Sequence, residues 1–527
     1  MKKILRVQPT TLIFAFILLT FFYFALSHLR FPLIMDEIEY PLVGKAVSET
    51  FKAFYYRGEY LPSNLGLWHT PLYTVLLGVY FKFVPFLTST ARFFGVLTYG
   101  LSALLFYFWY KKHWGSPNLL PFSLLLLPYV VFSSLLPDID TQLLPLMATL
   151  SLILLVTNKA WIGITLSFLS KLSFGPIISV SFLVSNYREL FSQKFKSLLI
   201  LFLGVAVFLI LWPFLNGLLG GSIKSNLDYL SHSTAKPELT FSYLYTTFRE
   251  NLPIVLLWLN PLLIIGAFLS FTKNRYQTFS LTAAFLFLFL YVFIFRSYPF
   301  GYVKYLPTVL FFFIFSLTFY FNQYKKIFPQ IYIYFIVIFL FALLVSFSNK
   351  WGDPIFYAYY IKGFATVIKS YYLNPLFGLI IIFPLLFLKQ KRLYLIVGIL
   401  AVVLASGLRV DVEADTNKSV TYYYGETNMN GLLVYIKEQN PKVIIAPKDV
   451  GFNSKVKYVE LSPEILSSEM VLKDTAKKFG AEYLVSRNND YYAVKNWSVR
   501  NATILQKEAT INNFEVYKIV NFESRLR

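Results

Sequence analysis

Apolar runs long enough to cross a bilayer recur along most of this chain, and they constrain its fold more than any other feature. The first, residues 10–29, has no acidic or basic side chain except His28 near its end. About 20 apolar residues span the hydrocarbon core of a bilayer. Similar runs continue to residue 409, and 57% of the chain is hydrophobic while only 14% is charged. No soluble domain needs so much apolar surface, so we predict a polytopic membrane protein.

The charges between the runs indicate which of them cross the membrane. Reading runs and charges together predicts about thirteen spans, near residues 10–29, 90–110, 118–136, 141–158, 160–172, 175–187, 198–217, 252–271, 278–296, 303–321, 331–348, 372–388 and 393–409. The segments then assigned to the cytoplasm carry one acid, Glu189, against sixteen basic groups, which are Lys2, Lys3, Arg6, Lys111, Lys112, Lys159, Arg188, Lys194, Lys196, Lys273, Arg275, Lys325, Lys326, Lys389, Lys391 and Arg392. This bias follows the positive-inside rule and explains much of the net charge of +21 without nucleic-acid binding. We predict a cytoplasmic N-terminus, an extracytoplasmic C-terminus and a location in the plasma membrane.

Residues 66–87 resemble one more span, but counting them as one would invert the charge bias of every later loop. We therefore predict a helix that lies in the outer membrane interface, with His69 at its start and Lys82 in its sequence.

The chain after residue 410 has the pattern of a small soluble α/β domain. Strands are expected at Ser419–Tyr424, Lys442–Ala446, Lys455–Leu461, Glu482–Val485 and Phe514–Val520, with helices near 430–439 and 464–479. Gly480 is expected to end the second helix. Zero cysteines exclude disulfides and thiolate metal sites. The predicted fold is thus an all-α membrane domain over 1–409 and an extracytoplasmic α/β domain over 410–527.

Acidic side chains gather at two places on the predicted outer face. Asp36 and Glu37 follow the first span, and Asp138 and Asp140 lie where the third span ends and the fourth begins. A carboxylate pair at a span boundary either binds a hard cation or fixes and activates a polar group. The alternative is a solvated turn in which Asp140 caps the next helix.

Basic side chains are expected at the same level of the membrane: His69, Lys171, and Arg296 and Lys304 on either side of a short loop. A lone interfacial lysine usually extends to lipid headgroups. Together, however, carboxylates suit deprotonation of an attacking hydroxyl, and cations suit a phosphate leaving group. Because no nucleotide sugars are available outside the cell, a transferase there would use a lipid-borne phosphate donor. No Walker loop, Rossmann glycine motif, H-E-x-x-H or G-x-S-x-G is present.

The order of these motifs resembles a known family. Met35–Tyr40 reads MDEIEY, Trp68–Tyr73 reads WHTPLY, Arg92 follows Ala91, and an acid and a hairpin lysine come later. This order is similar to that of the GT-C membrane glycosyltransferases, most of all the branch of protein O-mannosyltransferases and the lipid A aminoarabinose transferase. The resemblance covers the whole membrane region and includes the external α/β tail.

The resemblance implies a role for each matching residue. Asp36 would be the catalytic carboxylate and Glu37 its paired acid, while His69, Lys171, Arg296 and Lys304 would bind the donor phosphate. The implied substrate-positioning residues are Tyr40, Arg92, Asp138, Asp140 and Tyr305. Two departures weaken the donor site: Glu39 stands where some relatives have arginine, and Thr70 separates His69 from Pro71.

The expected reaction is a single displacement that moves a hexosyl or pentosyl group from a polyprenyl phosphate to an acceptor hydroxyl and inverts the anomeric centre. The acceptor is a glycan, a lipid or a protein, the surroundings are membrane lipids, and no cofactor is required. A divalent cation held by Asp36, Asp138 and Asp140 is an alternative. Two other functions stay open: a transporter or lipid flippase, although we find no internal repeat, and a non-catalytic assembly protein.

Overall fold

The structure is a computed structural model that describes residues 9–30, 32–33, 36–55, 64–155, 159–187, 195–233, 240–272, 274–294, 305–348, 390–413, 429–462, 464–487, 504–512 and 514–520. The chain divides into two compact units. We call Met1–Arg30, Leu67–Val75 and Ser89–Tyr423 the helical unit, and Phe31–Gly66, Leu76–Thr88 and Tyr424–Arg527 the mixed unit. The C-terminal segment thus shares a unit with residues that follow the first apolar helix. The predicted domain boundary at 409/410 stays a prediction, since residues 414–428 lie outside the described residues.

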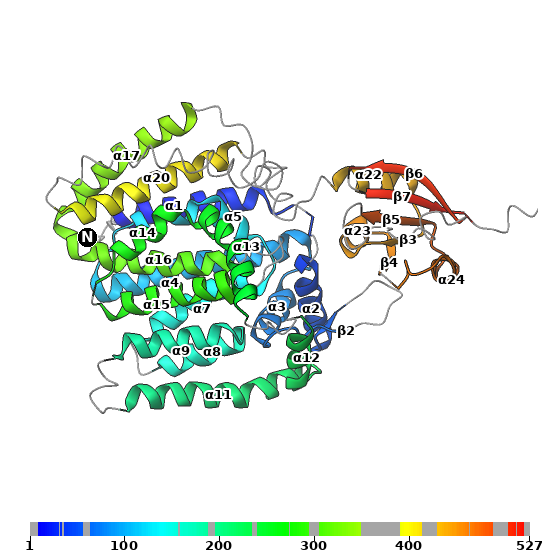
Figure 1. Ribbon diagram of the computed structural model, residues 1–527, viewed down its shortest axis with the longest axis horizontal. Coiled ribbons are helices and arrows are strands. Elements are labelled where there is room, and N and C mark those ends of the chain that lie inside the picture. The colour runs from blue at the N-terminus through cyan, green and yellow to red at the C-terminus, as the bar shows by residue number, and fades with distance from the viewer. Residues whose placement is uncertain are drawn as a thin grey trace, which may run out of the picture. The chain divides into compact units, whose positions relative to one another are not determined.

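The helical unit consists mainly of apolar helices, which differ greatly in length (Figure 1). Its long helices are α1 (Pro9–Ser27), α4 (Thr88–Trp114), α11 (Lys196–Leu218), α13 (Phe241–Leu259), α15 (Arg275–Phe289), α16 (Leu306–Phe321), α17 (Phe328–Ser348) and α20 (Lys391–Glu413). Its short elements are η1 (Leu120–Leu126), α5 (Pro128–Ser134), α6 (Ile139–Gln142), α7 (Leu144–Leu155), α8 (Ala160–Ser170), α9 (Phe174–Ser185), α12 (Ile223–Ser233), α14 (Pro261–Leu269), η2 (Leu290–Ile294) and η4 (Asn322–Ile327).

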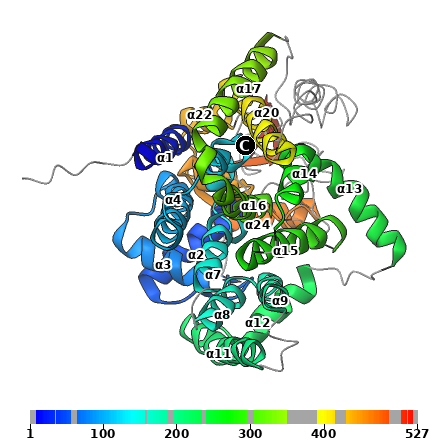
Figure 2. The ribbon, with the colours of Figure 1, turned by 90° about the vertical axis from the view of Figure 1, so that its left-hand side faces the viewer.

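Helix α16 forms the centre of this unit, because every one of its residues is buried. Helices α7 and α15 and the segment η1 pack against it, and Figure 2 shows it surrounded by other helices of the unit. Helices α11, α8 and α9 lie side by side at one edge of the unit in both views, with α8 in contact with the other two (Figures 1 and 2).

Five helical segments within the described residues are long and apolar enough to cross a membrane: Thr10–Ser27, Thr88–Trp114, Lys196–Leu218, Arg275–Ile294 and Leu306–Leu344. Twelve of the thirteen expected spans coincide with helical segments, and residues 372–388 lie outside the described residues. The number of crossings therefore stays a prediction. Helix α3 (Leu72–Phe83) occupies the segment assigned to the interface, and its 12 residues are too few for the roughly 20 that a span requires.

Two expected spans are interrupted, in each case at a residue that precedes proline. Leu127 has extended backbone angles and separates η1 from α5, which begins at Pro128. Asn260, with φ 58° and ψ 122°, separates α13 from α14, which begins at Pro261. Proline disfavours helical angles in the residue before it, so neither 118–136 nor 252–271 is one continuous helix. The segment 218–251, between two of the expected spans, contains α12 and the first turns of α13.

The mixed unit contains α2 (Asp36–Thr50), a small ladder of β1 (Phe54–Tyr55) and β2 (Asn64–Leu65), most of α3, and an α/β region. Its sheet has the order β4-β3-β5-β7-β6, formed by β3 (Val443–Ala446), β4 (Lys457–Glu460), β5 (Tyr483–Arg487), β6 (Leu505–Ile511) and β7 (Phe514–Ile519). Strands β4, β3 and β5 are parallel, and β7 runs antiparallel to both β5 and β6.

Helices cover both faces of this sheet. Alternate residues of a strand point to opposite faces, so Ile445 packs in one core with α24 (Glu469–Phe479), and Ile444 in another with α22 (Asn430–Gln439) and α23 (Lys448–Ser454). Gly480 ends α24 in a left-handed conformation, as expected. Strand β6 and helix α23 were not expected, and Ser419–Tyr424 lies outside the described residues.

Candidate active site

The start of α6 carries two of the predicted site residues. Asp138 is the N-cap of α6: its Oδ1 accepts a hydrogen bond from the backbone N–H of Asp140 at 2.9 Å. In the alternative, a solvated turn, Asp140 would cap the next helix; the residue that caps α6 is instead Asp138, two positions earlier. Asp138 and Asp140 are only 6% and 1% exposed, so this segment is not a solvated turn.

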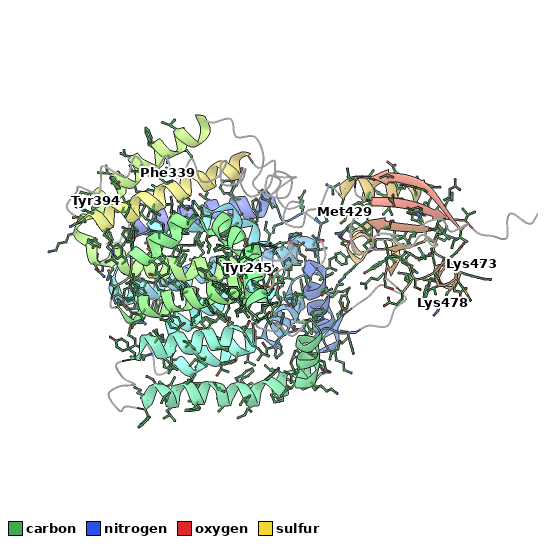
Figure 3. All side chains as sticks on the ribbon, in the orientation of Figure 1. Tyr245, Phe339, Tyr394, Met429, Lys473 and Lys478 are labelled. Atoms are coloured by element: carbon green, nitrogen blue, oxygen red, sulfur yellow. The ribbon has the colours of Figure 1, made fainter. Side chains whose placement is uncertain are left out.

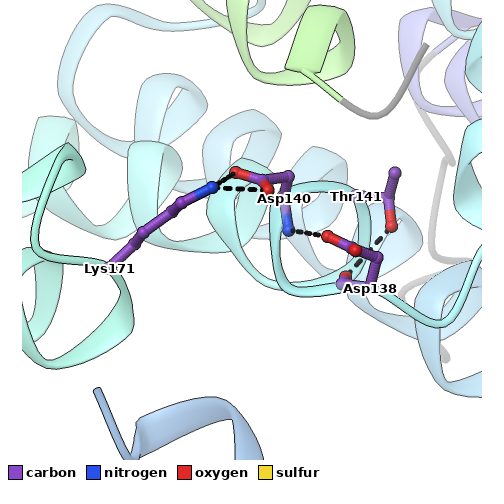
Figure 4. Close-up of polar contacts among 4 residues, drawn as sticks. All are labelled: Asp138, Asp140, Thr141 and Lys171. Carbon is purple, nitrogen blue, oxygen red and sulfur yellow. Dashed lines mark hydrogen bonds and ion pairs between the residues drawn. The ribbon is translucent and has the colours of Figure 1, made fainter. Parts of the chain in front are cut away.

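Asp140 forms an ion pair with Lys171, which lies between α8 and α9 (Figure 4). The Lys171 Nζ donates to Asp140 Oδ1 at 2.7 Å and to Oδ2 at 2.6 Å. The two side chains are 14% and 2% exposed, respectively. Removing an unpaired carboxylate from water is very costly, so the ammonium group is what allows Asp140 to be buried here.

Tyr305 completes this cluster from a third part of the chain. The Lys171 Nζ lies 5.1 Å from the centre of the Tyr305 ring, which in turn lies 5.1 Å from the ring of Tyr291. Tyr305 is the residue before α16 and directly follows Lys304. Three predicted site residues from positions 140, 171 and 305 therefore meet in the helical unit.

Hydrogen bonds from side chains to backbone carbonyls join helix α4 to the Asp138–Asp140 segment. Arg92 is fully buried, and its Nη1 donates to the carbonyl of Leu135 at 2.8 Å. Gln142 Nε2 donates to the carbonyl of Ala91 at 3.2 Å, and its Oε1 accepts from the Tyr73 hydroxyl at 2.7 Å. Arg92 thus supports the segment that carries Asp138 and Asp140.

A buried asparagine holds the segment that carries His69. Asn226, in α12, donates to the carbonyls of Leu67 at 2.8 Å and His69 at 2.6 Å. Its own carbonyl oxygen accepts from Trp212 Nε1 at 2.8 Å and from Asn216. The backbone of His69 is therefore fixed, while its side chain is half-buried. Sequence reasoning did not identify Asn226, because nothing in its local pattern marks it.

The remaining predicted residues lie in the mixed unit or outside the described residues. Asp36 is the first residue of α2, and its side chain is not described; Glu37 and Tyr40, in the same helix, are buried. Arg296 and Lys304 lie outside the described residues. A meeting of Asp36 with Lys171 therefore stays a prediction.

The Lys171–Asp140 arrangement is suited to holding an anion. An ammonium group has three N–H donors, and Asp140 fixes its position while part of the lysine remains exposed. A divalent cation fits Asp140 less well, because both of its carboxylate oxygens are bound to Lys171. Among the described side chains, no three His, Asp or Glu residues lie close enough together to hold a metal. The Asp36 contribution to a metal site stays open.

No protein-family profile matches the chain, and no curated protein sequence matches it. The structure is similar to the crystal structure of ArnT from Cupriavidus metallidurans bound to undecaprenyl phosphate, with a TM-score of 0.57 and 14% sequence identity over 97% of this chain and 98% of that chain. ArnT is a GT-C glycosyltransferase. The chain has a GT-C fold.

A second GT-C structure is also similar. It is the archaeal oligosaccharyltransferase AglB from Archaeoglobus fulgidus in complex with an inhibitory peptide and a dolichol-phosphate, with a TM-score of 0.47 and 12% identity over 94% of this chain and 72% of that chain. The resemblance based on MDEIEY, WHTPLY and the hairpin lysine is confirmed for the GT-C fold. The roles assigned to single residues stay predictions.

Proposed function

We propose that this protein is a membrane glycosyltransferase that takes a sugar from a polyprenyl-phosphate donor and transfers it to a hydroxyl group on the outer face of the membrane. The observation that carries this proposal is the fold: it matches ArnT, which was crystallised with undecaprenyl phosphate, over 97% of the chain. Within the described residues, five helical segments long and apolar enough to cross a membrane support a membrane location. The sugar is a hexose or a pentose, and the acceptor is a glycan, lipid or protein.

Charge on the departing phosphate is the main obstacle to this reaction, and basic side chains are the residues that can stabilise it. We assign this task to Lys171, His69, Arg296 and Lys304. The ion pair with Asp140 supports the assignment of Lys171, because it holds the ammonium group in one place before the donor binds. A positioned cation loses less entropy on binding than a freely moving lysine does.

The acceptor hydroxyl is the other reacting group. In the proposed step, Asp36, assisted by Glu37, takes the hydroxyl proton while the acceptor oxygen forms a bond to the anomeric carbon. The bond from that carbon to the phosphate oxygen breaks, and the electron pair leaves with the polyprenyl phosphate. Attack opposite the leaving group inverts the anomeric centre. Tyr40, Arg92, Asp138, Asp140 and Tyr305 position the substrates or the residues that contact them.

The test is transfer by the purified chain in phospholipid nanodiscs. Undecaprenyl-phosphate-linked hexoses and pentoses would be supplied with cell-envelope acceptors, and both glycosylated product and released undecaprenyl phosphate would be measured. A positioned base contributes about 10²–10⁴-fold, so Asp36→Asn should reduce turnover by that factor. Asp474→Asn, at an exposed position of α24, is the matched control and should change nothing. In sealed proteoliposomes, movement of the lipid-linked sugar from one leaflet to the other without bond formation would instead support a flippase.

A further inference from the structure

Helix α23 and helix α2, both in the mixed unit, are joined by a largely buried ion pair. The Lys448 ammonium group binds the Glu39 carboxylate, and the two side chains are 9% and 24% exposed, respectively. The same ammonium lies 4.8 Å from the centre of the Tyr55 ring. These partners are separated by 409 positions in the sequence, so the pair connects the C-terminal α/β region to the segment after the first apolar helix.

Two further contacts join α23 to other parts of the mixed unit. Asn453 Nδ2 donates to the carbonyl of Leu33 at 2.6 Å, three residues before α2 begins. The ring of Phe452 lies 6.2 Å, edge to face, from that of Phe86, which lies between α3 and α4. Helix α23 therefore contacts the segment before α2 and the chain after α3, as well as α2 itself.

Helix α23 is itself fixed firmly to the sheet. Its Asp449 forms a buried ion pair with Arg487 of β5. Gly451 packs so tightly on β4 that an added Cβ would lie 2.3 Å from the ring of Tyr458. Two adjacent buried ion pairs are costly to desolvate and need not stabilise a fold. Helix α23 carries one residue of each pair, Lys448 and Asp449. A role in fixing one arrangement of α2 explains why a helix this short takes part in both pairs.

We propose that Lys448 is a positioning residue: through Glu39, the C-terminal α/β region sets the orientation of the first turn of α2, which carries Asp36 and Glu37. The inference rests on the function proposed above and assigns to the C-terminal region a part in that reaction. Glu39 lies about one helical turn after Asp36, so a displacement of Glu39 also moves Asp36. A displacement of about 1 Å at a catalytic group can cost about 100-fold in rate.

The kinetic test compares Lys448→Met with Lys448→Arg and with Lys518→Met in full-length protein in nanodiscs. Lys518 is the control because it pairs with Glu508 in the same sheet but is exposed. Lys448→Met should lower kcat about 10- to 100-fold and change the donor KM less than threefold. Lys448→Arg, which keeps the charge, should restore most of the activity, and Lys518→Met should resemble the wild type. An unchanged kcat, or a loss confined to KM, would overturn the inference.

A second measurement does not depend on transfer. Amide hydrogen exchange of the first turns of α2 should be at least tenfold faster in Lys448→Met than in the wild type, and unchanged in Lys518→Met. If the first variant cannot be purified, Glu39→Gln combined with Lys448→Met removes both charges together and should show the same change. Equal exchange rates would overturn the inference. An inactive wild type with the expected exchange pattern would count against the proposed transferase and leave the positioning contact in place.

Discussion

At the scale of single residues, the Lys171–Asp140 pair is the most informative contact in the helical unit. Both oxygens of a carboxylate that is almost completely buried bind one ammonium group. Such a pair contributes little net stability, since desolvation offsets the attraction, but the loss of one partner is severe. The contribution of the Lys171–Asp140 pair to stability and the contribution of Lys171 to anion binding can therefore be separated by mutation.

We predict that Lys171→Met lowers stability by about 3–5 kcal/mol, because it removes the ammonium group that binds both oxygens of the buried Asp140 carboxylate. The double variant Asp140→Asn/Lys171→Met should regain most of that stability. Both variants should bind undecaprenyl phosphate about 10- to 100-fold more weakly than the wild type, the loss expected for one hydrogen bond to a charged group. Thermal unfolding and lipid binding in detergent measure the two effects.

Lys112→Met, at an exposed position of α4, is the control for this comparison. It should match the wild type in both measurements. Wild-type affinity in the double variant would show that Lys171 does not bind phosphate.

The sequence allowed each of these residues to be predicted but not their pairing. A charged group beside an apolar run is conspicuous, which is why Asp140 and Lys171 were identified. Which acid meets which base depends on how α6 packs near the α8–α9 turn, and that is a tertiary property. The solvated-turn alternative placed the helix cap at Asp140 rather than at Asp138 for a related reason: α6 begins at Ile139, and helix ends are the least certain part of a sequence-based prediction.

At the scale of elements, the close approach of α4 to the 134–142 segment determines where Asp138 and Asp140 lie. Gly95 makes this approach possible, because a Cβ there would lie 2.1 Å from the carbonyl oxygen of Ser134. Backbone atoms cannot move aside as a flexible side chain can. A single methyl group is therefore enough to displace the segment.

We predict that Gly95→Ala lowers stability by about 1–3 kcal/mol and reduces transfer, because α4 must move away from Ser134. Gly217→Ala in α11 is the control, since among the described residues no heavy atom outside its own helix lies within 4 Å of a Cβ there. It should raise stability slightly, as alanine favours a helix more than glycine by up to about 1 kcal/mol. The thermal unfolding midpoints of the two variants should move in opposite directions. A shift in the same direction would show that the close approach is not a constraint.

A second element-scale prediction concerns the contact between α12 and the His69 segment. Asn226→Asp preserves the shape and the acceptor oxygens but removes the N–H donors that bind the carbonyls of Leu67 and His69. Buried carbonyls without donors cost about 1–3 kcal/mol. We expect lower stability and a donor KM raised about tenfold, the equivalent of 1.4 kcal/mol, measured by steady-state transfer. Asn430→Asp, exposed at the start of α22, should leave both unchanged; an unchanged KM in Asn226→Asp would contradict a role in holding His69.

At the scale of the whole chain, hydrophobicity was enough to predict the helical part but not every part of the sheet. Strand β6 contains Gln506, Lys507 and Glu508 in succession and lies at the sheet edge with mostly exposed side chains. It therefore lacks the apolar alternation by which the other strands were recognised. Helix α23 is short, polar and contains Gly451, so its sequence resembles a turn. Both elements depend on tertiary packing for their structure.

Orientation in the membrane is a property of the whole chain that the absence of cysteine makes simple to test. Lys473 projects from α24 into solvent (Figure 3), and Lys326 is exposed in η4, within a loop predicted to be cytoplasmic. In intact cells, a membrane-impermeant maleimide should label Lys473→Cys but not Lys326→Cys. In permeabilised cells, both variants should be labelled. The cysteine-free parent gives the background. The reason is the positive-inside bias: the orientation that assigns sixteen basic groups and one acid to the cytoplasm also predicts an extracytoplasmic C-terminal region. Labelling of Lys326→Cys alone in intact cells would show that the topology is the reverse of the predicted one. Asp36 and Glu37 would then lie on the cytoplasmic side, where nucleotide sugars are available. The argument for a lipid-linked donor would no longer hold.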